Sequence, residues 1–259
     1  MLSISDLCFN VNQKIILHKV NLDFLPGKMN FILGPNGSGK STFIKICSRQ
    51  LDPTSGIVEM DGISIANYRF DDLAKMRAVL SQQPLLDFPL TVSEVVMMGR
   101  YPHFDIIPSK IDHAICEEVM KTLQLESIAQ FPYLKLSGGE KQRVQFARVL
   151  AQIWNSNEIS NRYIFLDEPF NNLDIKYQME FVKLLKNFVD EKTILVASLH
   201  DLNMAIQFAD QIVIFKNGMV YSNGNPVDVM TPGIIKEVFE VDINLIASTD
   251  DKSKFIQFT

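Results

Sequence analysis

Apolar and polar positions change their period along the chain, and each change predicts a different element. Residues 1–10 alternate between the two kinds, as in a half-buried strand. Residues 31–33 form a short apolar run that stops at a glycine-rich segment, 34–37. Apolar side chains then recur at helical spacing from 43 to 47. This order predicts a strand, a glycine-rich loop and a helix in succession.

The middle of the chain has a different pattern. From about residue 84 to 152 the periodicity is helical, including Ile111 to Leu125, and no convincing strand interrupts it. Strands are predicted again at 163–166 and 193–199, with a helix from Lys176 to Val189 between them. Such alternation is typical of a parallel sheet with crossover helices. Residues 84–152 are therefore interpreted as a helical lobe inserted into an α/β core.

A hairpin is predicted near the end of the chain. Two apolar runs, Ile212 to Phe215 and Met219 to Ser222, flank the turn Lys216-Asn217-Gly218. Asn and Gly tolerate positive φ, which a tight hairpin turn requires. The whole chain, 1–259, is expected to be one elaborated domain, because its length suits a single core with an inserted lobe.

Composition and charge narrow the class of protein. With 47% hydrophobic and 21% charged residues, the chain is an ordinary globular protein. The net charge of −5 and the lack of a Lys or Arg run give no electrostatic reason to expect nucleic-acid binding. The chain has three cysteines, Cys8, Cys47 and Cys116. An odd number of cysteines fits reduced thiols. No secretory signal and no run of about 18 apolar residues is visible, so a membrane role is expected to need a partner.

Residues 34–41 match the phosphate-loop pattern G-x-x-x-x-G-K-[ST] in full. Glycines let backbone N–H groups converge on phosphate oxygens, and the following helix presents the positive end of its dipole. Lys40 is expected to neutralise the β- and γ-phosphates, and Ser41 to help hold Mg²⁺. The residues expected to bind ATP here are Gly34, Pro35, Asn36, Gly37, Ser38, Gly39, Lys40, Ser41 and Thr42.

Two carboxylates end the predicted strand 163–166. Asp167 and Glu168 therefore lie at the edge where an α/β sheet places its site. Asp167 is expected to hold Mg²⁺, directly or through water, and Glu168 to orient and polarise the attacking water. Acidic residues often end strands, so the position downstream of a phosphate loop is what makes this pair informative.

A second helix start suited to anions follows the lobe's last loop. The apolar positions of this helix are Val144, Ala147, Leu150 and Trp154. The segment before it reads Leu136-Ser137-Gly138-Gly139-Glu140. Here the chain resembles the ATP-binding cassette (ABC) family, whose signature corresponds to Leu136 to Val144, and the resemblance covers nearly the whole chain.

The resemblance implies a P-loop NTPase fold. Residues 1–83 and 153–259 would form a RecA-like core with an N-terminal antiparallel β subdomain. It also implies that two chains pair head to tail, with Ser137 and Gly139 of one closing on ATP held by Lys40 of the other. Ser137 as a helix cap is compatible with that role.

Further positions match the family residue by residue. Gln82, with Gln83 as the alternative, resembles the glutamine that touches Mg²⁺ and the attacking water. Asp174 resembles the aspartate of the loop that couples the two sites. His200 resembles the histidine that contacts the γ-phosphate.

Two places depart from the family's pattern. Val11, with Phe9 nearby, stands where an aromatic residue commonly stacks on adenine, which leaves aromatic stacking open. The segment after Glu168 reads Pro169-Phe170-Asn171-Asn172, where small or hydroxyl residues are more usual.

Segments of the helical lobe narrow the resemblance to a class of importer. Phe88 to Val96 and Met98 to His103 resemble the ATPases of importers for iron-siderophores, haem and cobalamin. Arg148 to Trp154, followed by a polar extension at 155–162, looks most like the haemin-import ATPases, with siderophore and cobalamin importers as alternatives. Tyr101 and His103 themselves are interpreted as the start of a surface helix and not as haem ligands.

The resemblance also implies partners. These are a second ATPase chain, two integral membrane permease subunits and, indirectly, a periplasmic or surface substrate-binding protein, at the cytoplasmic face of a bacterial inner membrane. The alternative from a different class is a soluble ABC ATPase that acts on ribosomes or DNA. That class usually carries two cassettes or a long coiled-coil insertion, and this chain has neither.

Overall fold

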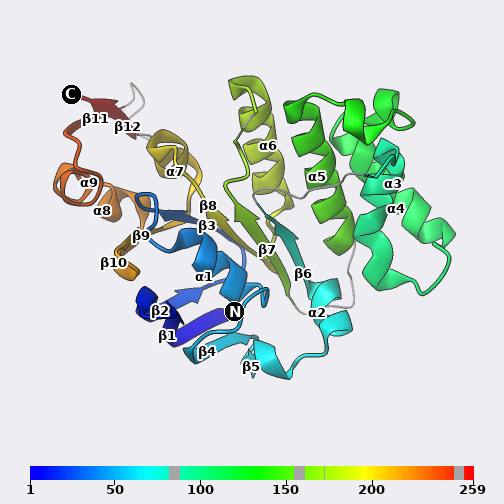
Figure 1. Ribbon diagram of the computed structural model, residues 1–259. Helices are drawn as coiled ribbons and strands as arrows, with labels where there is room; N and C mark the ends of the chain where they lie inside the picture. The colour runs from blue at the N-terminus through cyan, green and yellow to red at the C-terminus, as the bar shows by residue number, and fades with distance from the viewer. Residues whose placement is uncertain (82–87, 155–160, 172, 248–253) are drawn as a thin grey trace.

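A six-stranded sheet forms the centre of the protein (Figure 1). The computed structural model describes residues 1–81, 88–154, 161–171, 173–247 and 254–259. The strand order is β10-β9-β3-β8-β7-β6, and every neighbouring pair is parallel except the β9–β10 hairpin. The strands in that order are Met219–Gly224, Gln211–Lys216, Lys28–Leu33, Thr193–Ser198, Arg162–Asp167 and Arg77–Leu80.

Helices cover both faces of this sheet, which explains why its central strands are apolar throughout. In β8, Ile194 and Val196 pack on one face, while Leu195 and Ala197 pack on the other. Helix α1 lies on the first face, and α5, α6 and α7 lie on the second. The α-helices are α1 Lys40–Cys47, α2 Phe70–Met76, α3 Val92–Met97, α4 Lys110–Thr122, α5 Gly138–Ile153, α6 Ile175–Phe188, α7 Leu202–Phe208, α8 Pro226–Val229 and α9 Pro232–Phe239.

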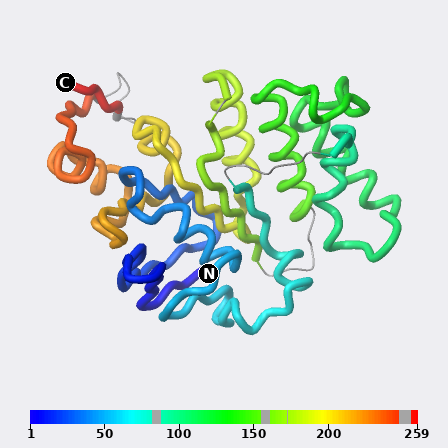
Figure 2. The backbone as a smooth tube through the Cα atoms, in the orientation of Figure 1, coloured from blue at the N-terminus to red at the C-terminus, as the bar shows by residue number. Residues whose placement is uncertain are grey.

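Two smaller sheets complete the strands. An antiparallel sheet of order β2-β1-β4-β5 covers the first face together with α1. A two-stranded sheet, β11-β12, lies beside α7 on the side away from the helical lobe (Figure 2). These strands are β1 Leu2–Val11, β2 Lys14–Phe24, β4 Ser55–Met60, β5 Ile63–Ser64, β11 Ile243–Ala247 and β12 Lys254–Phe258.

The helical lobe contains α3, α4, most of α5 and a 3₁₀ helix, η2, at Met98–His103. Capping boxes begin its three α-helices at Thr91, Ser109 and Ser137, because each hydroxyl accepts the N3 amide while the N3 carboxylate accepts the cap's own amide. The remaining 3₁₀ turns are η1 Ile65–Asn67, η3 Glu126–Ile128 and η4 Tyr133–Lys135.

Polar contacts join the lobe to the core. Gln152 Nε2 donates to the carbonyl oxygens of Ala74 at 2.7 Å and Arg77 at 2.9 Å. His103 Nε2 lies 2.7 Å from the carbonyl oxygen of Gln152. The interpretation of His103 as part of a surface helix start is therefore wrong, since its half-buried ring reaches across to the end of α5. Trp154 likewise follows α5 as its C-cap instead of lying within it.

The three cysteines are free thiols. Cys47 and Cys116 are buried, and burial raises the pKa of the Cys116 thiol to about 11. These two thiols are therefore unreactive at neutral pH. Over the described ranges, no helix has the length and apolar content that crossing a membrane requires.

Gly99 provides a test of how closely η2 packs on α5. A Cβ at this position would lie 2.1 Å from the carbonyl oxygen of Arg148, so Gly99→Ala forces the two elements apart. We expect a loss of about 1–3 kcal/mol in the free energy of unfolding, measured by urea denaturation. Gly233→Ala is the matched control, because nothing lies within 4 Å of a Cβ there. Equal stability of the two variants would contradict the close packing.

Candidate functional site

The loop between β3 and α1 has a backbone that requires glycine. Gly37 and Gly39 take φ values of +76° and +105°, in the region that side chains other than hydrogen disfavour. At Gly34, a Cβ would lie 2.4 Å from the carbonyl oxygen of Phe215. The three glycines therefore leave a bare backbone at the N-terminus of α1, which is the geometry of an anion site.

Lys40 is held across this loop. Its Nζ donates to the carbonyl oxygens of Gly34 at 2.7 Å and Pro35 at 3.2 Å, and the residue is only 5% exposed. Burial lowers the pKa of Lys40, and the charges of Glu168 and Asp167 oppose that change. A lysine ammonium has three donors, so it can bind a phosphate from the same place.

Asp167 joins two elements that are far apart in sequence. Ser41 Oγ donates to Asp167 Oδ1 at 3.0 Å, and Ser198 Oγ donates to the same oxygen at 2.6 Å. Among the described residues there is no group of three or more Asp, Glu, His or Cys side chains that could hold a metal. One carboxylate with a hydroxyl nonetheless suits Mg²⁺, which takes few protein ligands and completes its shell with water and phosphate oxygens.

Ser198 was missed by the sequence analysis. It ends β8, directly opposite Asp167 in the parallel register, and it also accepts a hydrogen bond from the Glu168 amide at 2.9 Å. A serine at the end of an apolar strand is the only sequence signal, and it does not by itself indicate which strand lies beside it.

Glu168, the residue after Asp167, forms a polar pair with His200. His200 Nε2 lies 2.6 Å from Glu168 Oε1, and the two side chains are 43% and 11% exposed. Glu168 has φ +50°, an uncommon left-handed conformation for a residue with a side chain. A cavity of about 120 Å³ adjoins both residues, which is space enough for water beside the carboxylate.

The unusual segment after Glu168 supports this arrangement. Asn171 Nδ2 donates to Glu168 Oε2 at 2.7 Å, so both carboxylate oxygens have a partner. Phe170 is buried and its ring meets the edge of Phe181. The carbonyl oxygen of Pro169 accepts from Gln142 Nε2 on α5 at 2.8 Å. This departure from the usual small residues therefore has a structural role, in holding Glu168 and in contacting the signature helix.

Ser137 lies at the start of α5, on an exposed surface. Its Oγ donates to Glu140 Oε2 at 2.7 Å, and hydrogen bonds from Ser137 lower the pKa of Glu140. Gly138 and Gly139 form the first turn. Helices α5 and α1 pack on opposite faces of the sheet, so the site around Lys40 and the start of α5 are separate regions of one chain.

The other predicted residues are less informative. Asp174 caps α6 by accepting from the Tyr177 amide at 3.0 Å. Val11 ends β1 and is 49% exposed. Asn36 is exposed and Thr42 is half-buried in α1. Gln82, Gln83 and Asn172 lie outside the described residues.

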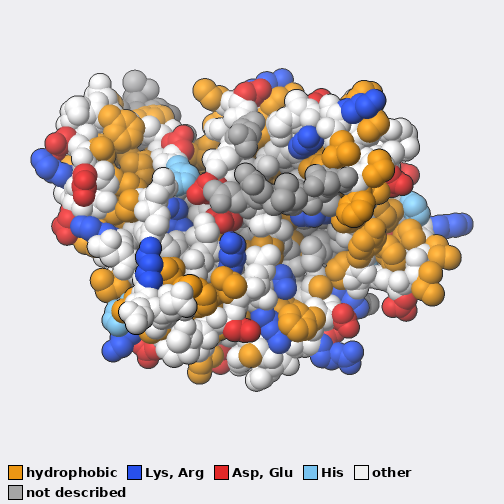
Figure 3. Space-filling model, viewed as in Figure 1, with side chains coloured by type: hydrophobic (Ala, Val, Ile, Leu, Met, Phe, Trp, Pro, Cys, Tyr) orange, Lys and Arg blue, Asp and Glu red, His pale blue; other side chains and the backbone are white. Residues whose placement is uncertain are grey.

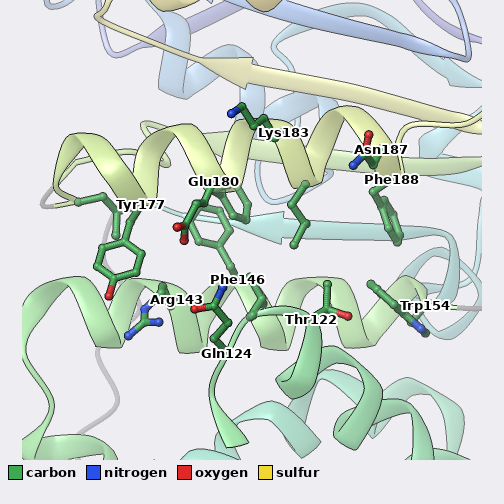
Figure 4. A pocket seen from close by; sticks show the side chains of 14 residues that line it. Thr122, Gln124, Arg143, Phe146, Trp154, Tyr177, Glu180, Lys183, Asn187 and Phe188 are labelled. Carbon is green, nitrogen blue, oxygen red and sulfur yellow. The ribbon is translucent and has the colours of Figure 1, made fainter.

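A larger cavity, of about 480 Å³, lies between α5 and α6 (Figure 4). Tyr177 and Phe188 on α6 point toward α5, and the guanidinium of Arg143 lies 4.4 Å from the Tyr177 ring centroid. None of its lining residues belongs to the phosphate loop or to the carboxylate pair. This cavity is therefore not the nucleotide site, although it is larger than the cavity beside Glu168.

A strand, a glycine-rich loop and a helix, with Asp167 and Glu168 two strands away in the sheet, define a nucleoside-triphosphate-binding protein of the P-loop type. The family model described as ABC transporter matches residues 17–171. The chain belongs to the ABC transporter family.

Curated relatives carry a more specific name. The hemin import ATP-binding protein HmuV of Gloeobacter violaceus is 41% identical over 239 residues, which cover 92% of this chain and 87% of that protein. HmuV of Bordetella avium is 37% identical, with 95% and 94% covered. HmuV of Escherichia coli O157:H7 is 36% identical, with 99% and 98% covered.

Solved structures have the same fold. An ABC transporter in an inward-facing conformation superposes with a TM-score of 0.82 at 23% identity, covering 100% of this chain and 96% of that chain. The dimeric structure of MJ0796, a bacterial ABC transporter cassette, superposes with a TM-score of 0.75 at 30% identity, covering 87% and 99%.

Ser198→Ala tests whether the serine positions the carboxylates. We expect the maximal rate of ATP hydrolysis to fall about 10- to 100-fold, because a hydrogen bond to a charged group contributes about 1.5–3 kcal/mol. Steady-state kinetics would measure kcat and KM separately. Ser48→Ala is the control, since Ser48 is equally buried but its hydroxyl donates to the Lys45 carbonyl. An unchanged kcat for Ser198→Ala would exclude the positioning role.

Proposed function

We propose that this chain is the ATP-hydrolysing subunit that energises a membrane importer of haem. One observation carries the enzymatic part: the pair formed by Glu168 and His200 at 2.6 Å lies beside the contact between Ser41 and Asp167. A candidate base, a metal ligand and a phosphate loop thus meet at one edge of the sheet. The names of the relatives support haem as the cargo.

In this proposal the residues divide the work of phosphoryl transfer. Lys40 and the bare N–H groups of the loop bind the β- and γ-phosphates, whose charge grows in the transition state. Ser41 and Asp167 are the residues that would hold Mg²⁺, which supplies further charge stabilisation. Glu168 orients the attacking water and accepts its proton, and His200 holds the Glu168 carboxylate in place.

The site also needs a second chain. ABC importer ATPase subunits act as dimers with membrane permease partners, and MJ0796 provides a dimeric relative. Because α5 packs on the face opposite to α1, the Ser137 end of α5 is free to close on a nucleotide held by another copy. We infer a homodimer at the cytoplasmic face of the membrane, bound to two permease subunits.

Purification from membranes tests whether the chain is the ATPase subunit of a haem importer. The tagged chain should recover an integral membrane protein, and the complex in lipid nanodiscs should hydrolyse ATP faster when its binding protein is loaded with haem. Stimulation by an iron-siderophore or by cobalamin instead would change the cargo and keep the class. Recovery of ribosomes or nucleic acid without a membrane protein would exclude the importer.

Glu168→Gln should abolish turnover and keep nucleotide binding. The phosphate and metal ligands remain, but the water loses the carboxylate that accepts its proton, so we expect kcat to fall about 100- to 10,000-fold. ATP affinity, measured by equilibrium titration, should change little. Glu117→Gln, at an exposed position on α4, is the control. Turnover near that of the unmodified protein would remove Glu168 from the role of base.

Mixing two inactive variants should restore hydrolysis. Lys40→Ala removes the phosphate-binding cation, and Ser137→Arg places a bulky side chain where the second chain must close. In a mixed dimer one composite site carries both changes and the other carries neither, so activity should return in proportion to heterodimers. Each variant mixed with itself is the control. No recovery from demonstrated heterodimers, or full activity from a monomer, would contradict a shared site.

A further inference from the structure

The Glu168 carboxylate lies beside open space. The cavity of about 120 Å³ that adjoins it is also lined by Asn171, Gln178 and His200. Figure 3 shows a histidine and acidic side chains at the surface of the visible face, in the region between α6 and α7. A glutamate side chain is long and flexible, so a cavity on one side leaves it room to adopt other rotamers. Hydrogen bonds must therefore decide where this carboxylate points.

Two of the contacts to the carboxylate come from different parts of the chain. His200 Nε2 lies 2.6 Å from Glu168 Oε1, and Asn171 Nδ2 donates to Oε2 at 2.7 Å. Asn171 is in the turn that follows Glu168, where its amide N–H donates to the Glu168 carbonyl oxygen. The Asn171 side chain is exposed, so its position depends on how firmly the backbone of this turn is held.

The helices α5 and α6 hold that backbone on either side of Asn171. Before it, the carbonyl oxygen of Pro169 accepts from Gln142 Nε2 on α5 at 2.8 Å. After it, the carbonyl oxygen of Leu173 accepts from Gln178 Nε2 on α6 at 2.9 Å. Two glutamine side chains thus anchor the short segment that carries Asn171.

The contact with Gln142 is the link to the helical lobe. Proline has no N–H, so the carbonyl oxygen is the only backbone group of Pro169 that can make a hydrogen bond. Gln142 is half-buried in the first half of α5, and its amide reaches this oxygen from the helix that Ser137 caps. A chain of three contacts therefore runs from α5 through Pro169 and Asn171 to the Glu168 carboxylate.

We propose that Gln142 and Asn171 are positioning residues for ATP hydrolysis and act in series. Gln142 fixes the turn to α5, and Asn171 fixes the Glu168 carboxylate in the orientation that receives the proton of the attacking water. This inference rests on the proposed function and adds two residues to it. Neither side chain contacts the phosphate loop or the metal ligands, so their loss should lower the rate and leave ATP affinity unchanged.

Asn171→Asp tests the hydrogen bond separately from the shape of the side chain. It keeps the size of the residue but replaces the amide donor with a carboxylate that repels Glu168. We expect kcat to fall at least about tenfold, with Asn171→Ala between this variant and the unmodified chain. The dissociation constant for ATP and the thermal unfolding temperature should stay the same. Asn187→Asp, at an exposed position on α6, is the matched control.

A double-mutant cycle tests whether the two residues act in series. Gln142→Ala should lower kcat less than Asn171→Ala does, because it loosens the turn without removing the donor. The double variant should be no slower than Asn171→Ala alone, since both changes interrupt one chain of contacts. Gln257→Ala, on the exposed part of β12, is the control for loss of a glutamine. Losses that multiply in the double variant would overturn the arrangement in series.

The outcomes separate this inference from the proposed function. If Glu168→Gln abolishes hydrolysis while Asn171→Asp keeps the usual kcat, only the positioning role is overturned. If Glu168→Gln itself hydrolyses ATP at nearly the usual rate, the assignment of the base fails, and the positioning role fails with it. A loss of ATP affinity in Asn171→Asp that matches its loss of rate would also overturn the positioning role, because it would mark a damaged nucleotide site.

Discussion

The parallel register of β3, β8 and β7 is the constraint on which the site depends. It places Asp167 opposite Ser198 at one edge of the sheet, and it brings Ser41, at the start of the helix after β3, within 3.0 Å of the same carboxylate. A slip of one residue would turn Asp167 toward the opposite face. The apolar faces of β8 prevent that slip, because each face is buried under a different layer of helices or strands.

Glu168 shows what the register makes possible. Its left-handed backbone is a strained conformation, which costs about 1–3 kcal/mol and persists only where the surroundings compensate. The Ser198 hydroxyl oxygen accepts a hydrogen bond from the Glu168 amide. His200 contacts one oxygen of the Glu168 carboxylate, and Asn171 donates to the other. The carboxylate is therefore positioned before any nucleotide arrives, which lowers the cost of reorganisation during the reaction.

Helix α5 connects the surface of the proposed dimer to the core. Its N-cap is Ser137, which faces another copy in the proposed dimer, and its last turn carries Gln152, which donates to core carbonyl oxygens at Ala74 and Arg77. Gln142 on the same helix contacts the segment after Glu168. A change at the proposed dimer surface would therefore reach the segment that holds Glu168 along one continuous helix.

Much of the site could be predicted from the sequence alone, because its parts are local. The glycines at 34, 37 and 39, the lysine after them and the paired carboxylates at 167–168 each depend on a few neighbouring residues, and so do the helix cap at Ser137 and the turn at Gly218. The strands and helices of the core were predictable for the same reason, since their apolar periods follow from burial. Ser198, Asn171 and the reach of His103 to Gln152 were decided only by the tertiary structure. Each of these depends on which distant segment lies beside it, and a charge or hydroxyl in a sequence does not specify its partner until the sheet register and helix packing bring the two together.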